Sequence, residues 1–302
     1  MTILVAGLVN LETTLKVDSF PIEYSPVRYP FFGVNSTVSG VGYNVAKALT
    51  TLGASVNFLS MVGQDAAGTL VRGQLETDKI PGQCVIDGLA TTPQSVIIYD
   101  RDGNRQINAD LKDIQQCEYP EDRFDEALSA CSLAVLSNIN FTRAFLQRTQ
   151  RAGKPIATDV HSIANLEDDY NRDYMREADI LFMSHEWLPC SPEEWVKRLM
   201  NRYGTEIMVI GLGADGALLS VKSHRFLERI PAVYTRPVVN TIGAGDALFS
   251  AFVHVYNRTQ SPYEAIRKAM LFASYKIGTT GAADGFLDEQ ALEGMYAQLV
   301  AN

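Results

Sequence analysis

The sequence predicts an α/β protein in which a mostly parallel sheet is covered by helices on both faces. Short runs of Val, Ile and Leu recur without polar alternation, which is typical of strands buried on both faces. Amphipathic helical segments lie between several of these runs, and alternating strands and helices predict a parallel sheet sandwiched by helices. The expected strands are ILVAGLV at 3–9, VNFLSMV at 56–62, LAVLSN at 133–138, PIATDV at 155–160, DILFMS at 179–184 and IMVIGL at 207–212.

Several helices carry recognisable end signals. The segment 44–53 ends in Gly53, and the amphipathic segment 141–154 has Gly153 as its stop, because glycine is common just beyond a helix C-terminus. The segment 191–204 opens with Ser, Pro and two Glu, which predicts a capped N-terminus favoured by the helix dipole. The last third of the chain is predicted to form helices over 244–257, about 262–277 and about 288–300.

Two segments interrupt this alternation. Residues 13–38 hold aromatic residues and prolines without a helix signal, and residues 91–108 predict two strands around a turn at Asp102 and Gly103. We therefore expect one domain over residues 1–302, carrying a small antiparallel sheet built from these two segments. Such a sheet would serve as a lid.

Composition limits the expected partners. The chain has 302 residues, of which 46% are hydrophobic, and a net charge of −9. This charge argues against nucleic acid or an anionic membrane as a partner, although a local positive site could still bind a phosphorylated ligand. The cysteines and histidines show no metal-ligand spacing. The start, MTILVAGLVN, lacks the features of a signal peptide, and no apolar run reaches transmembrane length. We expect a cytoplasmic protein.

The stretch NTIGAGDALFSAF, residues 240–252, predicts an anion site beside a general base. Gly243, Ala244 and Gly245 allow the backbone to approach a ligand, and a helix beginning there would present free N–H groups. The apolar run that follows predicts a buried, rigidly held helix. Asp246 would repel a phosphate, so it suits a base that takes a proton from a hydroxyl group. The alternative is that Asp246 only caps the helix.

Two other glycine-rich stretches are less specific. In residues 39–53, Gly40 and Gly42 precede a helix and Asn44 lies near its start, a pattern that a glycine turn with an Asn cap also explains. GLGADG at 211–216 matches the spacing of a dinucleotide-binding loop, which requires a helix next. The following ALLSV predicts a strand, so a turn between strands is favoured over a dehydrogenase.

Together these stretches resemble the ribokinase-like (PfkB-type) carbohydrate kinase family over essentially the whole chain. NTIGAGD is similar to its C-terminal signature, SGVGYNVAKALTTLG to its N-terminal signature, and VIGLGADGALL to its strand–turn–strand beside the nucleotide. The resemblance implies a Rossmann-like three-layer α/β/α fold with a β-sheet lid. It implies transfer of the ATP γ-phosphoryl group to a hydroxymethyl group, with Asp246 as general base and the backbone of residues 243–245 as anion hole.

The resemblance also implies roles for other residues. Those expected to bind the substrate are Glu12, Gly40, Gly42, Asn44, Asn140 and Asp246. Those expected near the nucleotide are Gly211, Gly213, Asp215, Gly216, Ser274 and Gly281.

This chain departs from the family pattern at several positions. Ser39 replaces the first glycine of the usual pair, and Glu12 stands where Asp is usual. Asn240 replaces the first aspartate of the signature, a position associated with potassium in some members, so activation by K⁺ is in doubt. The motif tied to Mg²⁺ is altered, with Trp187 in its Glu position and Glu186 one residue early. Mg²⁺ is still expected with ATP, held by Glu186 through water.

The substrate is left open by the sequence. We expect an unphosphorylated sugar, because no basic cluster near the lid would bind a second phosphate. A nucleoside is the alternative, since GVGYN resembles members that act on pseudouridine. A sensor that binds sugar or nucleotide without turnover is an alternative from another class. The apolar lid residues Phe31, Phe32 and SVIIY at 95–99 predict a homodimer formed through the lid.

Overall fold

The structure is a computed structural model that describes residues 1–301, and its larger sheet has nine strands. These strands are β1 (Thr2–Ala6), β4 (Ser55–Gly63), β5 (Val85–Leu89), β8 (Cys131–Leu136), β9 (Ile156–Asp159), β10 (Ile180–Ser184), β11 (Ile207–Gly211), β12 (Ala217–Val221) and β13 (Phe226–Ile230). Their order is β13-β12-β11-β10-β9-β8-β1-β4-β5. All pairings from β11 to β5 are parallel, whereas β12 is antiparallel to both its neighbours. The predicted mostly parallel sheet is confirmed.

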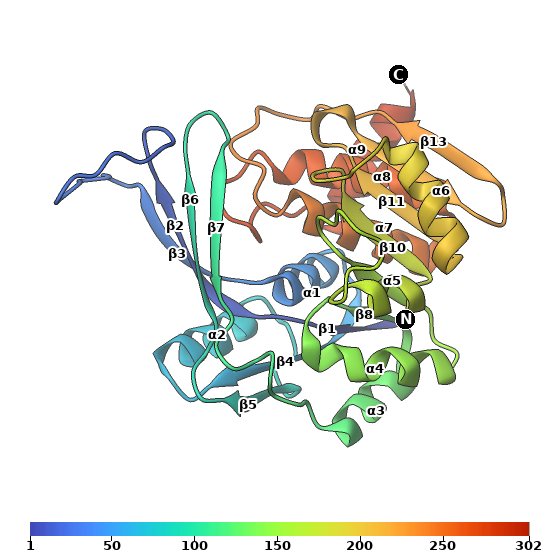
Figure 1. The fold of residues 1–302 in the computed structure, drawn as a ribbon, viewed down its shortest axis with the longest axis horizontal. Helices are drawn as coiled ribbons and strands as arrows, with labels where there is room; N and C mark the ends of the chain where they lie inside the picture. The colour runs from blue at the N-terminus through green and yellow to red at the C-terminus, as the bar shows by residue number, and fades with distance from the viewer. Residues whose placement is uncertain (302) are drawn as a thin grey trace.

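Helices cover both faces of this sheet (Figure 1). They are α1 (Val41–Thr51), α2 (Ala66–Thr77), α3 (Glu121–Ser129), α4 (Asn140–Arg151), α5 (Arg172–Glu177), α6 (Pro192–Tyr203), α7 (Ala244–Thr259), α8 (Pro262–Lys276) and α9 (Glu289–Ala301). One hydrophobic core joins the sheet to α1, α2, α7, α8 and α9, and a second joins it to α3, α4, α5 and α6.

The two cores explain why the strands are apolar without interruption. In β1, Ile3 and Val5 belong to the first core, whereas Leu4 belongs to the second. Successive side chains of a strand point to opposite faces, so a strand between two helical layers needs apolar residues at every position.

The predicted ends of α6 are confirmed. The Ser191 hydroxyl accepts from the Glu194 N–H at 3.3 Å, and Gly204 ends α6 with φ of 74°.

A second sheet has four strands in the order β3-β2-β6-β7 and stands to one side of the larger sheet (Figure 1). Its strands are β2 (Asn10–Lys16), β3 (Val34–Ser39), β6 (Gln94–Tyr99) and β7 (Arg105–Asp110). The predicted turn between β6 and β7 is present, closed by a bond from the Asp100 N–H to the Asn104 carbonyl at 3.1 Å.

The expectation that this sheet is antiparallel throughout is wrong at one pairing. β2 and β6 are parallel, with Glu12 opposite Ser95. The chain between them runs through β3, α1, β4, α2 and β5, and a crossover of this kind allows a parallel pairing that a hairpin cannot form. The sheet also begins at Asn10 and ends at Asp110, slightly beyond the predicted segments.

Within residues 1–301, none of the helices combines the length and hydrophobicity that crossing a membrane requires.

The contact between α1 and the end of β1 depends on a glycine. A Cβ atom at Gly42 would lie 2.7 Å from the Cα of Gly7. We expect Gly42→Ala to lower the free energy of unfolding by about 1–3 kcal/mol, because the backbones must separate to admit the methyl group. Urea unfolding measures this loss. The control is Gly73→Ala in α2, where a Cβ meets nothing within 4 Å; it should raise stability by about 0.5–1 kcal/mol. Equal stability of Gly42→Ala and wild type would contradict the packing argument.

Candidate functional site

The turn before α7 is built around Gly243. This residue has φ of 74°, and a Cβ here would lie 3.0 Å from the carbonyl carbon of Ala282, so only glycine fits without displacement. The first N–H groups of a helix have no acceptor within the helix, which makes this turn suitable for an anion. The Ala244 N–H, however, donates to the Thr241 carbonyl at 3.2 Å. Because the Ala244 N–H already has an acceptor, the N–H groups of Gly243 and Gly245 are better placed to donate to an anion.

Asp246 lies in the first turn of α7 and is half-buried. Its Oδ2 accepts from Asn44 Nδ2 of α1 at 2.7 Å, and Asn44 Oδ1 in turn accepts from the Ser39 hydroxyl at 3.4 Å. Burial raises the pKa of Asp246, while the Asn44 bond and the nearby His161 act in the opposite direction. The recorded side-chain partner of Asp246 is on another helix, which argues against a simple cap. A held carboxylate with a raised pKa suits a general base.

The glycines at the start of α1, Gly40 at its N-cap and Gly42 in its first turn, allow backbone segments to pack closely. Gly40 has φ of 105°, and a Cβ there would lie 2.7 Å from the carbonyl oxygen of Leu8. Gly42 packs against Gly7, so the structure gives both glycines a packing function, and their contact with a substrate stays a prediction. Ser39, in contrast, lies in β3 opposite Asn10, where an extended backbone accepts a side chain.

Glu12 lies on the buried face of β2 with 6% of its surface exposed. Its pKa is raised by burial and by Asp246, whereas a hydrogen bond with Ser39 and the charge of Lys276 lower it. The Oε1 atom of Glu12 and the Oδ1 atom of Asn10 have no hydrogen-bond partner among the described residues. A buried acceptor without a donor costs free energy. These two oxygens are therefore buried acceptors without a donor, and contact of Glu12 with a substrate stays a prediction.

The small sheet contacts the turn before α7 directly. Ile97 of β6 forms a small apolar cluster with Ile242 and Ala282. Arg105 Nη1 of β7 donates to the Thr241 hydroxyl at 3.2 Å. These contacts place the predicted lid beside the predicted anion hole.

The predicted nucleotide residues lie in two segments. Gly211 ends β11, Gly213 and Asp215 belong to a single 3₁₀ turn, and Gly216 has φ of 96°. β12 follows in antiparallel pairing, which confirms the turn between strands and rules out the dinucleotide-binding loop, since that loop needs a helix here.

The second segment lies at the end of α8 and beyond it. The Ser274 hydroxyl accepts from the Thr235 N–H at 3.2 Å, and Gly281 lies in the loop after α8. A Cβ at Gly281 would lie 2.8 Å from the carboxyl carbon of Asp284. Contact of either segment with a nucleotide stays a prediction.

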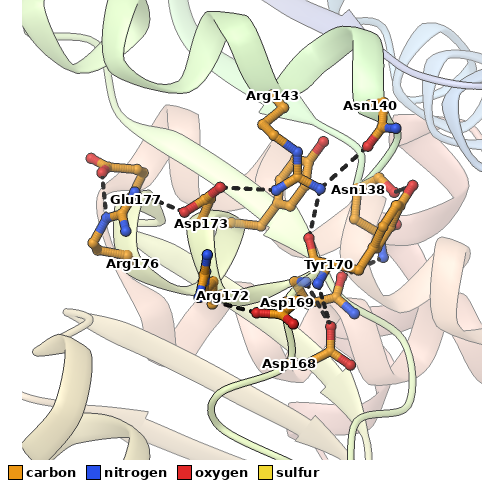
Figure 2. A network of polar contacts seen from close by, with 12 residues as sticks. Asn138, Asn140, Arg143, Asp168, Asp169, Tyr170, Arg172, Asp173, Arg176 and Glu177 are labelled. Atoms are coloured by element: carbon orange, nitrogen blue, oxygen red, sulfur yellow. Dashed lines mark hydrogen bonds and ion pairs between the residues drawn. The ribbon is translucent and has the colours of Figure 1, made fainter. Parts of the chain in front are cut away.

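Asn140 is occupied by a different network, shown in Figure 2. Its Nδ2 donates to the Gln115 carbonyl at 3.0 Å, and its Oδ1 accepts from Arg143 at 3.4 Å. Arg143 also donates to the Tyr170 carbonyl at 2.7 Å and to Asp173 at 3.0 Å. The recorded partners of Asn140 are thus structural, and the structure does not join it to Asn44 or Asp246.

The predicted metal residues do not form a metal site by themselves. Glu186 is exposed, and its N–H donates to the Ser184 hydroxyl at 3.2 Å. Over residues 1–301, no cluster of three or more His, Cys, Asp or Glu could hold a metal ion. Contact of the exposed Glu186 carboxylate with an Mg²⁺ ion through water stays a prediction.

Asn240 does not fit the role of a ligand for a monovalent cation. Its Nδ2 donates to the Thr280 carbonyl at 2.7 Å, and its Oδ1 accepts from the Ile242 N–H at 3.0 Å. The Ile242 carbonyl accepts from the ammonium group of Lys276. Asn240 Oδ1 and the carbonyl oxygens of Thr280 and Ile242 each already accept a hydrogen bond from an N–H donor of the chain.

Lys276 is the site residue that sequence reasoning missed. It ends α8 and has no exposed surface. Burial lowers its pKa to about 8, while Asp246, Asp284 and Glu12 oppose that decrease. The sequence does show a lysine at the end of the apolar run MLFASYK. A lysine that ends a helix with its charge in water gives the same pattern, so this position did not indicate a site residue.

Comparison with known proteins identifies the family of this chain. Residues 2–289 match the family described as pfkB family carbohydrate kinase. An acarbose 7(IV)-phosphotransferase from an Actinoplanes species is 25% identical over 296 residues, covering 96% of both chains. A 1-phosphofructokinase from Haloferax volcanii is 31% identical over 257 residues, covering 81% of both chains.

A solved structure of a microbiome-derived acarbose kinase shares the fold, with a TM-score of 0.86, 24% identity and 98% coverage of both chains. The family match spans nearly the whole chain, and these relatives are named as kinases or phosphotransferases. The chain therefore belongs to the pfkB family of carbohydrate kinases and is a sugar or nucleoside kinase.

Proposed function

We propose that this kinase transfers the γ-phosphoryl group of ATP to a hydroxymethyl group of a small unphosphorylated sugar. The observation that carries the proposal is the 2.7 Å bond from Asn44 Nδ2 to Asp246 Oδ2. It holds a carboxylate of raised pKa in the first turn of α7, next to the turn that suits an anion. This arrangement supports a general base next to a phosphate site.

In the proposed reaction, Asp246 takes the proton of the hydroxyl group as its oxygen attacks the γ-phosphorus. The bond between this phosphorus and the bridging oxygen breaks, and ADP leaves with the electron pair. Phosphoryl transfer depends mainly on positioning and on stabilisation of charge, and N–H groups of residues 243–245 would supply that stabilisation. Mg²⁺ carried by ATP would supply positive charge beside the phosphates, and Glu186 would hold it through water.

The unpaired acceptors favour an unphosphorylated substrate. Glu12 Oε1 and Asn10 Oδ1 are buried and lack donors among the described residues. Sugar hydroxyl groups are donors that satisfy them, whereas a second phosphate would be repelled by the Glu12 carboxylate. The relative named acarbose 7(IV)-phosphotransferase agrees with a sugar, while the name 1-phosphofructokinase points to a phosphorylated one. A nucleoside is the second candidate because it also carries a ribose hydroxymethyl group.

Three further expectations belong to this proposal. The whole chain acts as one kinase domain, with the small sheet as its lid. The protein works in the cytoplasm. The exposed side chains of Phe31, Phe32, Val96 and Ile107 supply an apolar surface through which two lids could pair.

The substrate class can be tested by measuring ADP release with MgATP and a panel of acceptors. We expect stimulation by unphosphorylated sugars that carry a free hydroxymethyl group. Stimulation by nucleosides alone would favour the second candidate, and stimulation by sugar phosphates alone would exclude an unphosphorylated substrate. Ligand-induced thermal stabilisation without any ADP release would favour a sensor.

The role of Asp246 can be tested with Asp246→Asn, which keeps the size of the side chain and removes the base. We expect kcat to fall by about 10²–10⁴, because proton transfer by a placed base contributes this much. Affinity for MgATP, measured by calorimetry, should stay within a few-fold of wild type. Asp169→Asn removes the same charge from an exposed residue before α5 and should leave kcat unchanged. Turnover of Asp246→Asn at the wild-type rate would exclude Asp246 as the base.

The pH profile of kcat/KM tests the Asn44–Asp246 bond. A base must be deprotonated, so activity should decline as pH falls through the raised pKa of Asp246. The Asn44 bond lowers this pKa by stabilising the carboxylate. Asn44→Leu should therefore move the acid limb of the profile to higher pH, in addition to raising KM. Asn201→Leu, on the exposed side of α6, should leave the limb in place. An acid limb that stays unmoved in Asn44→Leu would contradict this assignment.

A further inference from the structure

Lys276 places a buried positive charge directly behind the turn before α7. The side chain has no exposed surface, and its Nζ donates to the carbonyl of Ile242. Ile242 immediately precedes Gly243, where the predicted phosphate-binding turn begins. The ammonium group and that turn are thus joined through a single residue.

The surroundings keep this lysine charged. Asp246, Asp284 and Glu12 attract the ammonium group, whereas Arg105 repels it. With a pKa of about 8, the ammonium form predominates at neutral pH. A buried charge is costly unless it is paired and hydrogen-bonded. The Ile242 carbonyl accepts a hydrogen bond from Lys276, and the charges of the three carboxylates offset part of the cost of its burial.

Asn240 completes the same arrangement. Its amide nitrogen donates to the Thr280 carbonyl at 2.7 Å, which a carboxylate at this position could not do because it has no donor. An aspartate at 240 would leave oxygens facing one another and would need a cation between them. With Asn240 and Lys276, N–H donors of the chain itself hold the Thr280 and Ile242 carbonyls.

We propose that Lys276 is a positioning residue whose ammonium group takes the place of a monovalent cation behind the phosphate-binding turn. The proposal rests on the proposed function, since it assumes that the turn binds the phosphates of ATP. The fixed charge orients the Ile242 carbonyl away from the phosphates and favours negative charge on the other side of the turn. Nucleotide binding is therefore independent of K⁺.

The first test uses wild-type protein and needs no variant. Calorimetry measures the Kd of the magnesium complex of β,γ-imido-ATP in KCl, NaCl and tetramethylammonium chloride at equal ionic strength. We expect the three values to agree within about two-fold, because no cation site has to be filled. A Kd that is about tenfold or more tighter in KCl would overturn the proposal, since such linkage requires a bound K⁺. Failure to bind the nucleotide in any salt would instead overturn the proposed function, and the present proposal with it.

The second test removes the ammonium group with Lys276→Ala. In tetramethylammonium chloride we expect nucleotide binding to weaken by about tenfold or more. Added methylammonium, or K⁺, should restore part of the affinity by entering the space that the side chain leaves. Restoration by a small cation distinguishes this role from a merely structural one. Unchanged affinity, or a loss that no small cation reverses, would contradict the proposal.

Lys268→Ala is the matched control. Lys268 lies two turns earlier in α8, is also buried, and donates to Glu264 at 2.7 Å and Glu293 at 2.6 Å. Its removal should lower stability without making nucleotide binding respond to K⁺ or methylammonium. If Lys276→Ala does not fold, Lys276→Met fills the same volume without charge, and the wild-type salt series still decides the question.

Discussion

The partial burial of the Asp246 carboxylate is the constraint on which the rest of the site depends. A carboxylate removed from water loses hydration, and its charged form persists only where donors and positive charges replace that hydration. Here the donor is Asn44 of α1, and Lys276 of α8 contributes a positive charge. The Asp246 carboxylate has this environment only when α1, α7 and α8 are packed together.

This packing explains several features that look separate in the sequence. Gly42 allows α1 to approach the end of β1 closely, which carries Asn44 to Asp246. Gly243 allows the turn before α7 to pass against the backbone of Ala282. The glycines thus act mainly by letting backbones approach one another, and the polar side chains then meet across the resulting short distances.

The sequence predicted most of the fold because the signals involved are local. Buried strands between two helical layers must be apolar throughout, and Ser191 and Gly204 mark the ends of α6 by local hydrogen bonding and backbone geometry. The small sheet was predicted less well. Its parallel pairing of β2 with β6 joins segments about eighty residues apart in the chain, and no local pattern specifies which distant strand becomes the neighbour.

The sequence by itself determined the fold class and the family signatures, and it was enough to propose Asp246 as the base, because each of these depends on contiguous residues. Tertiary structure decided which groups surround that base. Asn44 and Asp246 are 202 residues apart, and Lys276 reaches the turn only because α8 packs along α7. Charge, burial and hydrogen bonding at a site depend on distances between such segments, and these distances arise only when the helices pack on the sheet.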